Sequence, residues 1–115
     1  MKNVLVIGGS GFLGSHTAEE LTRRGYHVSI FDHSESKWLT PDQEMHVGDI
    51  LDREALDAVM KDVDVVYHFA GLADINKSAD YPFETINLNV SGTAQIVDAA
   101  VRANIERFIF ASTMY

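Results

Sequence analysis

The fold is decided by residues 4–14, whose sequence is VLVIGGSGFLG. The run from Val4 to Ile7 is continuously apolar, which is typical of a central parallel strand buried on both faces. A helical pattern follows the glycines, and a second apolar run, from Tyr26 to Phe31, ends at Asp32. This order of strand, glycine-rich turn, helix, strand and acid is the sequence form of a dinucleotide-binding βαβ unit.

Gly8, Gly11 and Gly14 form a G-x-x-G-x-x-G pattern. In such a pattern one glycine permits the tight turn, another lets the backbone approach a pyrophosphate, and the third lets the helix pack closely on the strand. The phosphates then meet N–H groups at the positive end of the helix. The alternative is a set of ordinary turn glycines, which the flanking strand and helix disfavour. A nucleotide-triphosphatase loop is also disfavoured, because Ser15 stands where its lysine would be.

The carboxylate of Asp32 can accept hydrogen bonds from both ribose hydroxyls of an adenosine, and it would repel a 2′-phosphate. Its position therefore favours NAD over NADP as the cofactor. Lys37 is the one nearby residue that weakens this prediction. The alternative is that Asp32 is an ordinary loop carboxylate.

Strands alternate with helices along the rest of the chain, which predicts an α/β fold with a parallel sheet and right-handed crossovers. We expect a Rossmann-like, doubly wound sheet with strand order 3-2-1-4-5, truncated after strand five, and helices on both faces. The further elements are expected as a strand at Glu44–Val47, a helix from Asp52 to about Lys61, a strand at Val63–Phe69, a helix from Pro82 to Ala103 and a strand at Arg107–Ala111.

Two of the expected helices carry apolar side chains at helical spacing, a pattern typical of a face turned to the core. The helix after the glycine-rich turn places Leu13, Thr17 and Leu21 on one stripe, with Ala18 beside them. The helix from Pro82 to Ala103 has a longer stripe. Its members are Ile86, Val90, Val97 and Val101.

The composition indicates one globular domain, because 115 residues are too few for two ordinary ones. A net charge of −8 argues against a nucleic-acid partner, since phosphate backbones are bound mainly by clustered Lys and Arg. No apolar run approaches the ~20 residues that a membrane span needs. The absence of cysteine fits a reducing compartment, so we expect a cytoplasmic protein. The five histidines lack metal-site spacing, which predicts no metal.

Five motifs occur in the order and spacing of one known family. They are Gly8-x-x-Gly11-x-x-Gly14, Asp49-Ile50, His68-Phe69-Ala70-Gly71, Asn89-Val90-Ser91-Gly92-Thr93 and Phe110-Ala111-Ser112-Thr113. In these motifs the chain resembles the extended short-chain dehydrogenases/reductases. Within them it is most similar to the NAD-dependent sugar-nucleotide epimerases and dehydratases of the UDP-glucose 4-epimerase type. The resemblance spans the whole chain.

The resemblance implies a set of contacts to NAD, which we take over as expectations. The residues concerned are Phe12 and Leu13 at the pyrophosphate, His33 beside Asp32, Asp49 and the backbone of Ile50 at the adenine, Phe69, Ala70 and Gly71 along the crevice beside strand one, and Asn89, on the inner face of the long helix, near the nicotinamide. Two alternatives stay open, a turn or cap acid at Asp49 and a solvated asparagine at Asn89. We expect His68 to be a packing residue of its strand, and Gly92 to allow close packing on the sheet.

The resemblance also places a catalytic hydroxyl at Thr113, with Ser112 as the neighbouring candidate. The family's Tyr-x-x-x-Lys pair does not occur in this sequence: Tyr26, Tyr67 and Tyr81 lack the lysine, and Tyr115 is the last residue. Residues 1–115 therefore resemble the NAD-binding amino-terminal segment of a longer enzyme, without its substrate domain. Such a segment is expected to hold NAD and not to turn over a sugar nucleotide.

The leading interpretation is the cofactor-binding portion of a sugar-nucleotide epimerase or dehydratase that works by transient hydride transfer to NAD. A non-catalytic dinucleotide-sensing protein of the same fold is an alternative, because fold alone does not set function. An NADP-dependent reductase of the same family is another, disfavoured by Asp32. In the family a nucleotide-sugar is the substrate and homodimers form through the long helix. Strand five would be an exposed apolar edge, which we expect to promote association.

Overall fold

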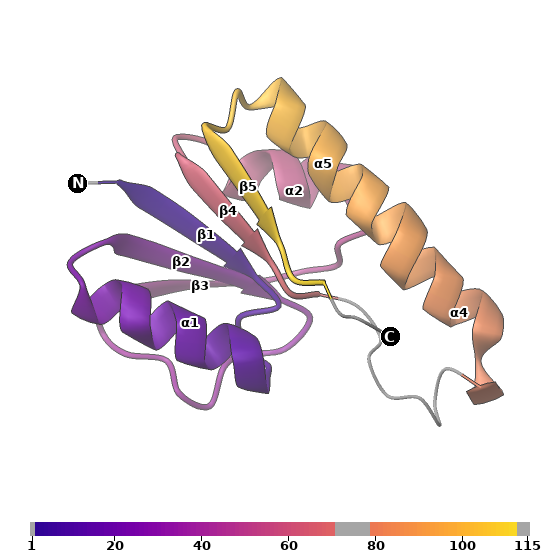
Figure 1. The fold of residues 1–115 in the computed structure, drawn as a ribbon, viewed down its shortest axis with the longest axis horizontal. Helices are drawn as coiled ribbons and strands as arrows, with labels where there is room; N and C mark the ends of the chain where they lie inside the picture. Colours follow the sequence, from indigo (N-terminus) through magenta and orange to yellow (C-terminus); the bar gives the residue numbers. More distant parts are fainter. Residues whose placement is uncertain (1, 71–78, 113–115) are drawn as a thin grey trace.

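The computed structural model describes residues 2–70 and 79–112. Its centre is a parallel sheet with strand order β3-β2-β1-β4-β5, which confirms the expected Rossmann-like topology (Figure 1). Because every neighbouring pair of strands is parallel, the carboxyl ends of all the strands meet at one edge of the sheet. The strands are β1 (Asn3–Ile7), β2 (His27–Asp32), β3 (Gln43–Val47), β4 (Val65–His68) and β5 (Arg107–Phe110).

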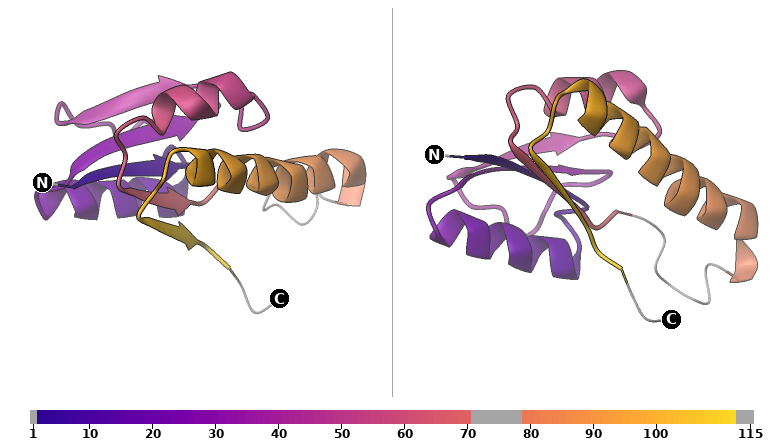
Figure 2. Two further views of the ribbon diagram at one scale, coloured as in Figure 1. Left: turned by 90° about the horizontal axis from the view of Figure 1, so that it is seen from above. Right: turned by 45° about the horizontal axis from the view of Figure 1, so that its top comes forward.

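The helices lie on both faces of the sheet. Helix α1 (Phe12–Arg23) covers one face, and α2 (Arg53–Val59) and α5 (Gly92–Arg102) cover the other (Figures 1 and 2). Right-handed crossovers explain why the helices lie on different faces. The chain moves toward the β3 edge of the sheet from β1 to β2, and toward the β5 edge from β3 to β4 and β5. No helix in the described ranges combines the length and the hydropathy needed to cross a membrane.

Strand β1 is buried on both faces and supplies both apolar cores. Leu5 and Ile7 pack into the core under α2 and α5, while Val4 and Val6 pack into the core under α1. This alternation is the two-residue period of a strand. All four side chains are at most 2% exposed, and each contributes about 2 kcal/mol by its burial. The strand that leads into the glycine-rich turn is therefore among the most firmly held parts of the chain.

Helix α1 buries a different stripe from the expected one. Its buried residues are Gly14, Ser15 and Ala18, and Leu21 packs against their core. Leu13 is 55% exposed, so its expected place on the buried stripe was wrong. Small residues decide the face: the helix can approach the glycine-rich turn closely only through Gly14, and this turns the adjacent Leu13 outward.

The helix expected from Pro82 to Ala103 is interrupted in its middle. Helix α4 (Pro82–Ile86) is followed by a π-helical turn, η1 (Asn87–Ser91), before α5 begins. The expected close packing of Gly92 is present, but its partner is a side chain rather than the sheet: a Cβ there would lie 2.4 Å from Ile50 Cδ1.

The long helix also turns a different face to the core than its apolar spacing indicates. The buried residues of α5 are Gly92, Ile96, Ala99 and Ala100, because alanine and glycine allow the closest approach. The four residues of the predicted stripe are instead exposed, and so is Phe83. We call these five residues the outer stripe. Their exposed fractions lie between 41% and 78%: Phe83, Ile86, Val90, Val97 and Val101.

Candidate dinucleotide site

Gly8 joins β1 to the glycine-rich turn and is held between two strands. It has φ +84°, which favours glycine, and a Cβ there would lie 2.7 Å from the amide nitrogen of Ala70. On its other side its N–H donates to Phe31 O at 2.8 Å. The turn therefore starts in direct backbone contact with β2 and with the continuation of β4.

The other two predicted glycines differ in what surrounds them. A Cβ at Gly14 would lie 2.1 Å from Gly8 O, so the first turn of α1 rests directly on the backbone of the turn. A Cβ at Gly11 would meet only Gly8 O at 3.5 Å, an ordinary contact. Gly8 and Gly14 are thus required by the protein itself, while Gly11 leaves open space toward solvent.

Gly9 is a further required glycine that the sequence pattern did not single out. A Cβ there would lie 2.6 Å from Ile30 Cγ2, a buried side chain of β2. Its place between two glycines of the motif was the available signal, since a residue in so tight a turn has little room on either side.

The amino-terminal end of α1 has the character of an anion site. Gly11 is its N-cap residue and offers no side chain to the first N–H groups, which have no partner within the helix. The first turn holds no acidic residue, so no carboxylate of the helix itself offsets the positive end of its dipole. Phe12 and Leu13 stand exposed beside it. Open space at Gly11 and free N–H groups together fit a pyrophosphate.

Asp32 ends β2 and is bound to the glycine-rich turn. Its side chain is 11% exposed. Oδ2 accepts the N–H of Ser10 at 3.0 Å, and Oδ1 accepts the N–H of His33 at 2.7 Å and lies 2.7 Å from His33 Nδ1. Since a carboxylate offers about four acceptor sites, these three contacts leave room for a ribose hydroxyl. Asp32 is therefore part of the turn and not a separate loop carboxylate.

Asp49 and Ile50 lie in the connection between β3 and α2. Asp49 is exposed, and its Oδ1 accepts the N–H of Leu51 at 2.9 Å. The alternative of a turn acid is therefore present in the structure, and a role toward adenine stays a prediction. Ile50 is buried and packs against the core, so only its backbone is available to a ligand.

The remaining predicted residues gather around the carboxyl end of β4. Phe69 and Ala70 continue β4 beside Gly8, where the N–H of Phe69 donates to Ile7 O at 2.8 Å. Asn89 is exposed in the π turn, which corrects its expected place on the inner face of a regular helix. Ser112 follows β5 and is exposed. The predictions for Gly71 and Thr113 fall outside the described residues.

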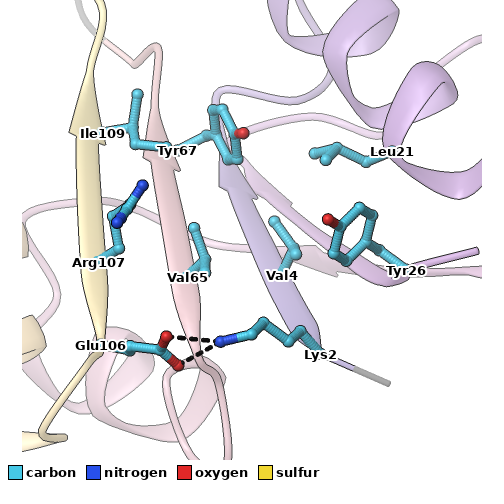
Figure 3. A pocket seen from close by; sticks show the side chains of 9 residues that line it. All are labelled: Lys2, Val4, Leu21, Tyr26, Val65, Tyr67, Glu106, Arg107 and Ile109. Atoms are coloured by element: carbon cyan, nitrogen blue, oxygen red, sulfur yellow. Dashed lines mark hydrogen bonds and ion pairs between the residues drawn. The ribbon is translucent and has the colours of Figure 1, made fainter. Parts of the chain in front are cut away.

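A separate hollow of about 320 Å³ lies on the α1 face of the sheet (Figure 3). Val65 and Arg107, the first residues of β4 and β5, are among its lining residues, and an ion pair between Lys2 and Glu106 closes one end. The hollow therefore reaches the amino ends of the strands, and none of the glycines of the turn lines it. It forms no part of the candidate site.

Comparison with known proteins identifies relatives over the whole chain. The NAD dependent epimerase/dehydratase family matches residues 4–115. UDP-glucose 4-epimerase of Rhizobium meliloti (strain 1021) is 36% identical over 96% of this chain and 35% of its own length. UDP-N-acetyl-alpha-D-glucosaminuronate decarboxylase of Bacillus cytotoxicus is 36% identical over 97% of this chain and 36% of its own.

Solved structures of the same family also match the chain. UDP-glucose 4-epimerase from Brucella ovis in complex with NAD superposes with a TM-score of 0.92 and 34% identity, over 99% of this chain and 36% of that protein. The chain thus spans about a third of the length of the relatives that it matches. Because the family match runs from Val4 to the last residue and takes in both the glycine-rich turn and Asp32, the chain belongs to the NAD-dependent epimerase/dehydratase family.

Proposed function

We propose that this chain binds NAD and is the cofactor-binding portion of an enzyme that acts on a nucleotide-linked sugar. The observation that carries the proposal is the cradle formed by Gly8, Gly11 and Gly14 with Asp32 bound to it. The cradle has open space at a positive helix end and, beside it, a carboxylate with a free acceptor position. A pyrophosphate and an adjacent ribose need both features together.

The proposed contacts follow the order of the cofactor. Phe12 and Leu13 cover the pyrophosphate, and Asp32 with His33 holds the ribose. Further contacts come from the rest of the carboxyl edge of the sheet. They are Asp49 and the backbone of Ile50 at the adenine, Phe69, Ala70 and Gly71 along the cofactor, and Asn89 near the nicotinamide. The position of the described members around one edge supports this order.

NAD supplies a transient hydride acceptor, which is the chemistry common to sugar-nucleotide epimerases and dehydratases. In this chain Thr113, or its neighbour Ser112, would hydrogen-bond the reacting sugar oxygen and share its proton. A tyrosine–lysine pair that could take up that proton is absent from the sequence of 115 residues. Residues 1–115 by themselves should therefore bind the cofactor without turning over a nucleotide-sugar.

Titration of the purified chain with NAD and with NADP tests the proposal. We expect NAD to bind roughly tenfold more tightly, about 1.4 kcal/mol, because a 2′-phosphate would face the carboxylate of Asp32. In the Asp32→Asn variant, which keeps a similar shape without the charge, the preference should shrink. Calorimetry gives both affinities, and Lys37→Ala is the control for attraction of the 2′-phosphate by the nearby lysine. Tighter binding of NADP by the unaltered chain would contradict the proposal.

The outer stripe supports a second part of the proposal, that two copies associate through α4 and α5. Val90, Val97 and Val101 line an open apolar hollow of about 660 Å³, and such a patch marks an interaction surface. We expect Val97→Asp with Val101→Asp to weaken self-association at least about tenfold. Leu39→Asp, at an exposed apolar side chain of the loop after β2, is the control. If sedimentation shows unchanged association of the double variant, the exposed edge at β5 becomes the expected contact.

A further inference from the structure

His68 is buried at the carboxyl end of β4 but does more than fill space. Its ring is 0% exposed, as expected of a packing residue, and lies against the rings of Phe108 and Phe110, with centroids 6.1 and 5.4 Å away. Its two nitrogens have separate partners. Nδ1 lies 3.2 Å from the amide nitrogen of Ala70, and Nε2 lies 2.9 Å from Thr93 Oγ1.

These contacts define the direction of each hydrogen bond. The amide of Ala70 can only donate, so Nδ1 accepts and the ring proton is on Nε2. Nε2–H then donates to Thr93 Oγ1, whose own hydroxyl donates to the carbonyl oxygen of Asn89 at 2.7 Å. A protonated ring would set a second N–H against the amide of Ala70. The chain of hydrogen bonds is therefore complete only with a neutral imidazole.

The hydrogen-bond chain joins two segments that are far apart in the sequence, residues 68–70 and 89–93, and the glycine-rich turn packs against the first of them. At one end the peptide between Phe69 and Ala70 lies directly against Gly8, where a Cβ would be 2.7 Å from the amide nitrogen. At the other end, 25 residues beyond His68, Thr93 holds the carbonyl of Asn89 in the π turn. π turns are rare and often lie at functional sites. Here the hydrogen-bond chain connects the π turn to Ala70, whose backbone packs against Gly8 at the start of the glycine-rich turn.

We propose that His68 and Thr93 are positioning residues of the dinucleotide site, which hold the backbone at Ala70 and the π turn at Asn89 in a constant relative position. Gly8 and Asn89 thereby face the same cofactor from two sides. The inference rests on the proposed function, in which NAD lies between them. Neither side chain needs to touch NAD: each acts through the backbone that it holds.

Thr93→Val tests this role, because valine keeps the shape of threonine and removes the hydroxyl. We expect it to weaken NAD binding roughly tenfold, the effect of losing the part-buried hydrogen bond to His68, and to leave AMP binding within about twofold. AMP reaches only the Asp32 side of the proposed site, and a general loss of folding would lower both affinities. Thr93→Ser, which retains the hydroxyl, should restore NAD binding.

Thr85→Val is the matched control. Thr85 also donates its hydroxyl to a carbonyl four residues earlier, that of Tyr81 at 2.8 Å, in the same helical segment. Its removal should leave the affinity for NAD unchanged. Thr93→Ala provides a second variant of the same bond and should show the same separation of NAD from AMP if the valine variant does not fold.

The outcomes separate this inference from the function on which it rests. If the unaltered chain does not bind NAD, the proposed function fails and the inference fails with it. If the unaltered chain binds NAD and Thr93→Val or Thr93→Ala binds it equally well, the positioning role alone is overturned. Nitrogen NMR of the unaltered chain should show the proton of His68 on Nε2, and a proton on Nδ1 would overturn the hydrogen-bond chain itself.

Discussion

Replacing Gly14 with alanine is expected to destabilise the folded chain by at least about 2 kcal/mol and to abolish NAD binding. The added Cβ would lie 2.1 Å from Gly8 O and 2.8 Å from Gly9 Cα. Both are backbone atoms of a turn that is held on two sides, so neither can rotate away. Alanine is the better helix former by only about 1 kcal/mol, which does not offset the overlap. Urea denaturation and an NAD titration measure the two effects.

Gly11→Ala is the matched control, because its Cβ would make one ordinary contact at 3.5 Å. Gly11 has φ −79° and ψ 179°, which alanine adopts freely, so the stability should change by no more than about 1 kcal/mol, the cost of a poorer N-cap. NAD binding should still fall, since the methyl group enters the space proposed for the pyrophosphate. A Gly14→Ala chain as stable as the unaltered one would contradict the close packing. Undiminished binding by Gly11→Ala would contradict the proposed place of the pyrophosphate.

Lowering the pH from about 6.5 to about 4 is expected to reduce the free energy of unfolding by about 3 kcal/mol through His68 alone. Burial lowers the pKa of His68 from 6.5 to about 4 in the folded chain. Between these two pH values the unfolded chain binds a proton that the folded chain does not. Stability from this source is therefore complete above about pH 6.5 and declines as the pH falls toward 4.

Urea denaturation at pH 7 and at pH 4.5 measures this effect, and the variant His68→Asn isolates it from the carboxylates that also titrate. The asparagine oxygen can still accept the N–H of Ala70, but the side chain has no charge to gain. We expect the variant to be less stable at pH 7 and to lose less stability on acidification than the unaltered chain. An equal loss in both proteins would show that His68 does not carry the pH dependence.

The order of the sheet and the place of the glycine-rich turn followed from residues that are close together in the chain. The apolar run from Val4 to Ile7, the glycines and Asp32 occur within one βαβ unit, and right-handed crossovers allow few arrangements of such units. The start of α2 is equally local: Oδ1 of Asp52, where the helix was expected to begin, accepts the N–H groups of Glu54 and Ala55 at 3.1 and 3.2 Å. Features set by neighbouring residues and by handedness were therefore predictable.

Which face of a helix is buried depended instead on distant partners. Apolar spacing favoured Leu13 and the stripe from Ile86 to Val101 as buried faces. The packed surfaces are instead those of Gly14, Ala99 and Ala100, because small residues let helices approach the sheet most closely. The same holds for the hydrogen-bond chain through His68: its members lie on a strand, a π turn and a helix. Periodicity describes one element at a time, and only the packing of elements decided which surfaces and polar groups met.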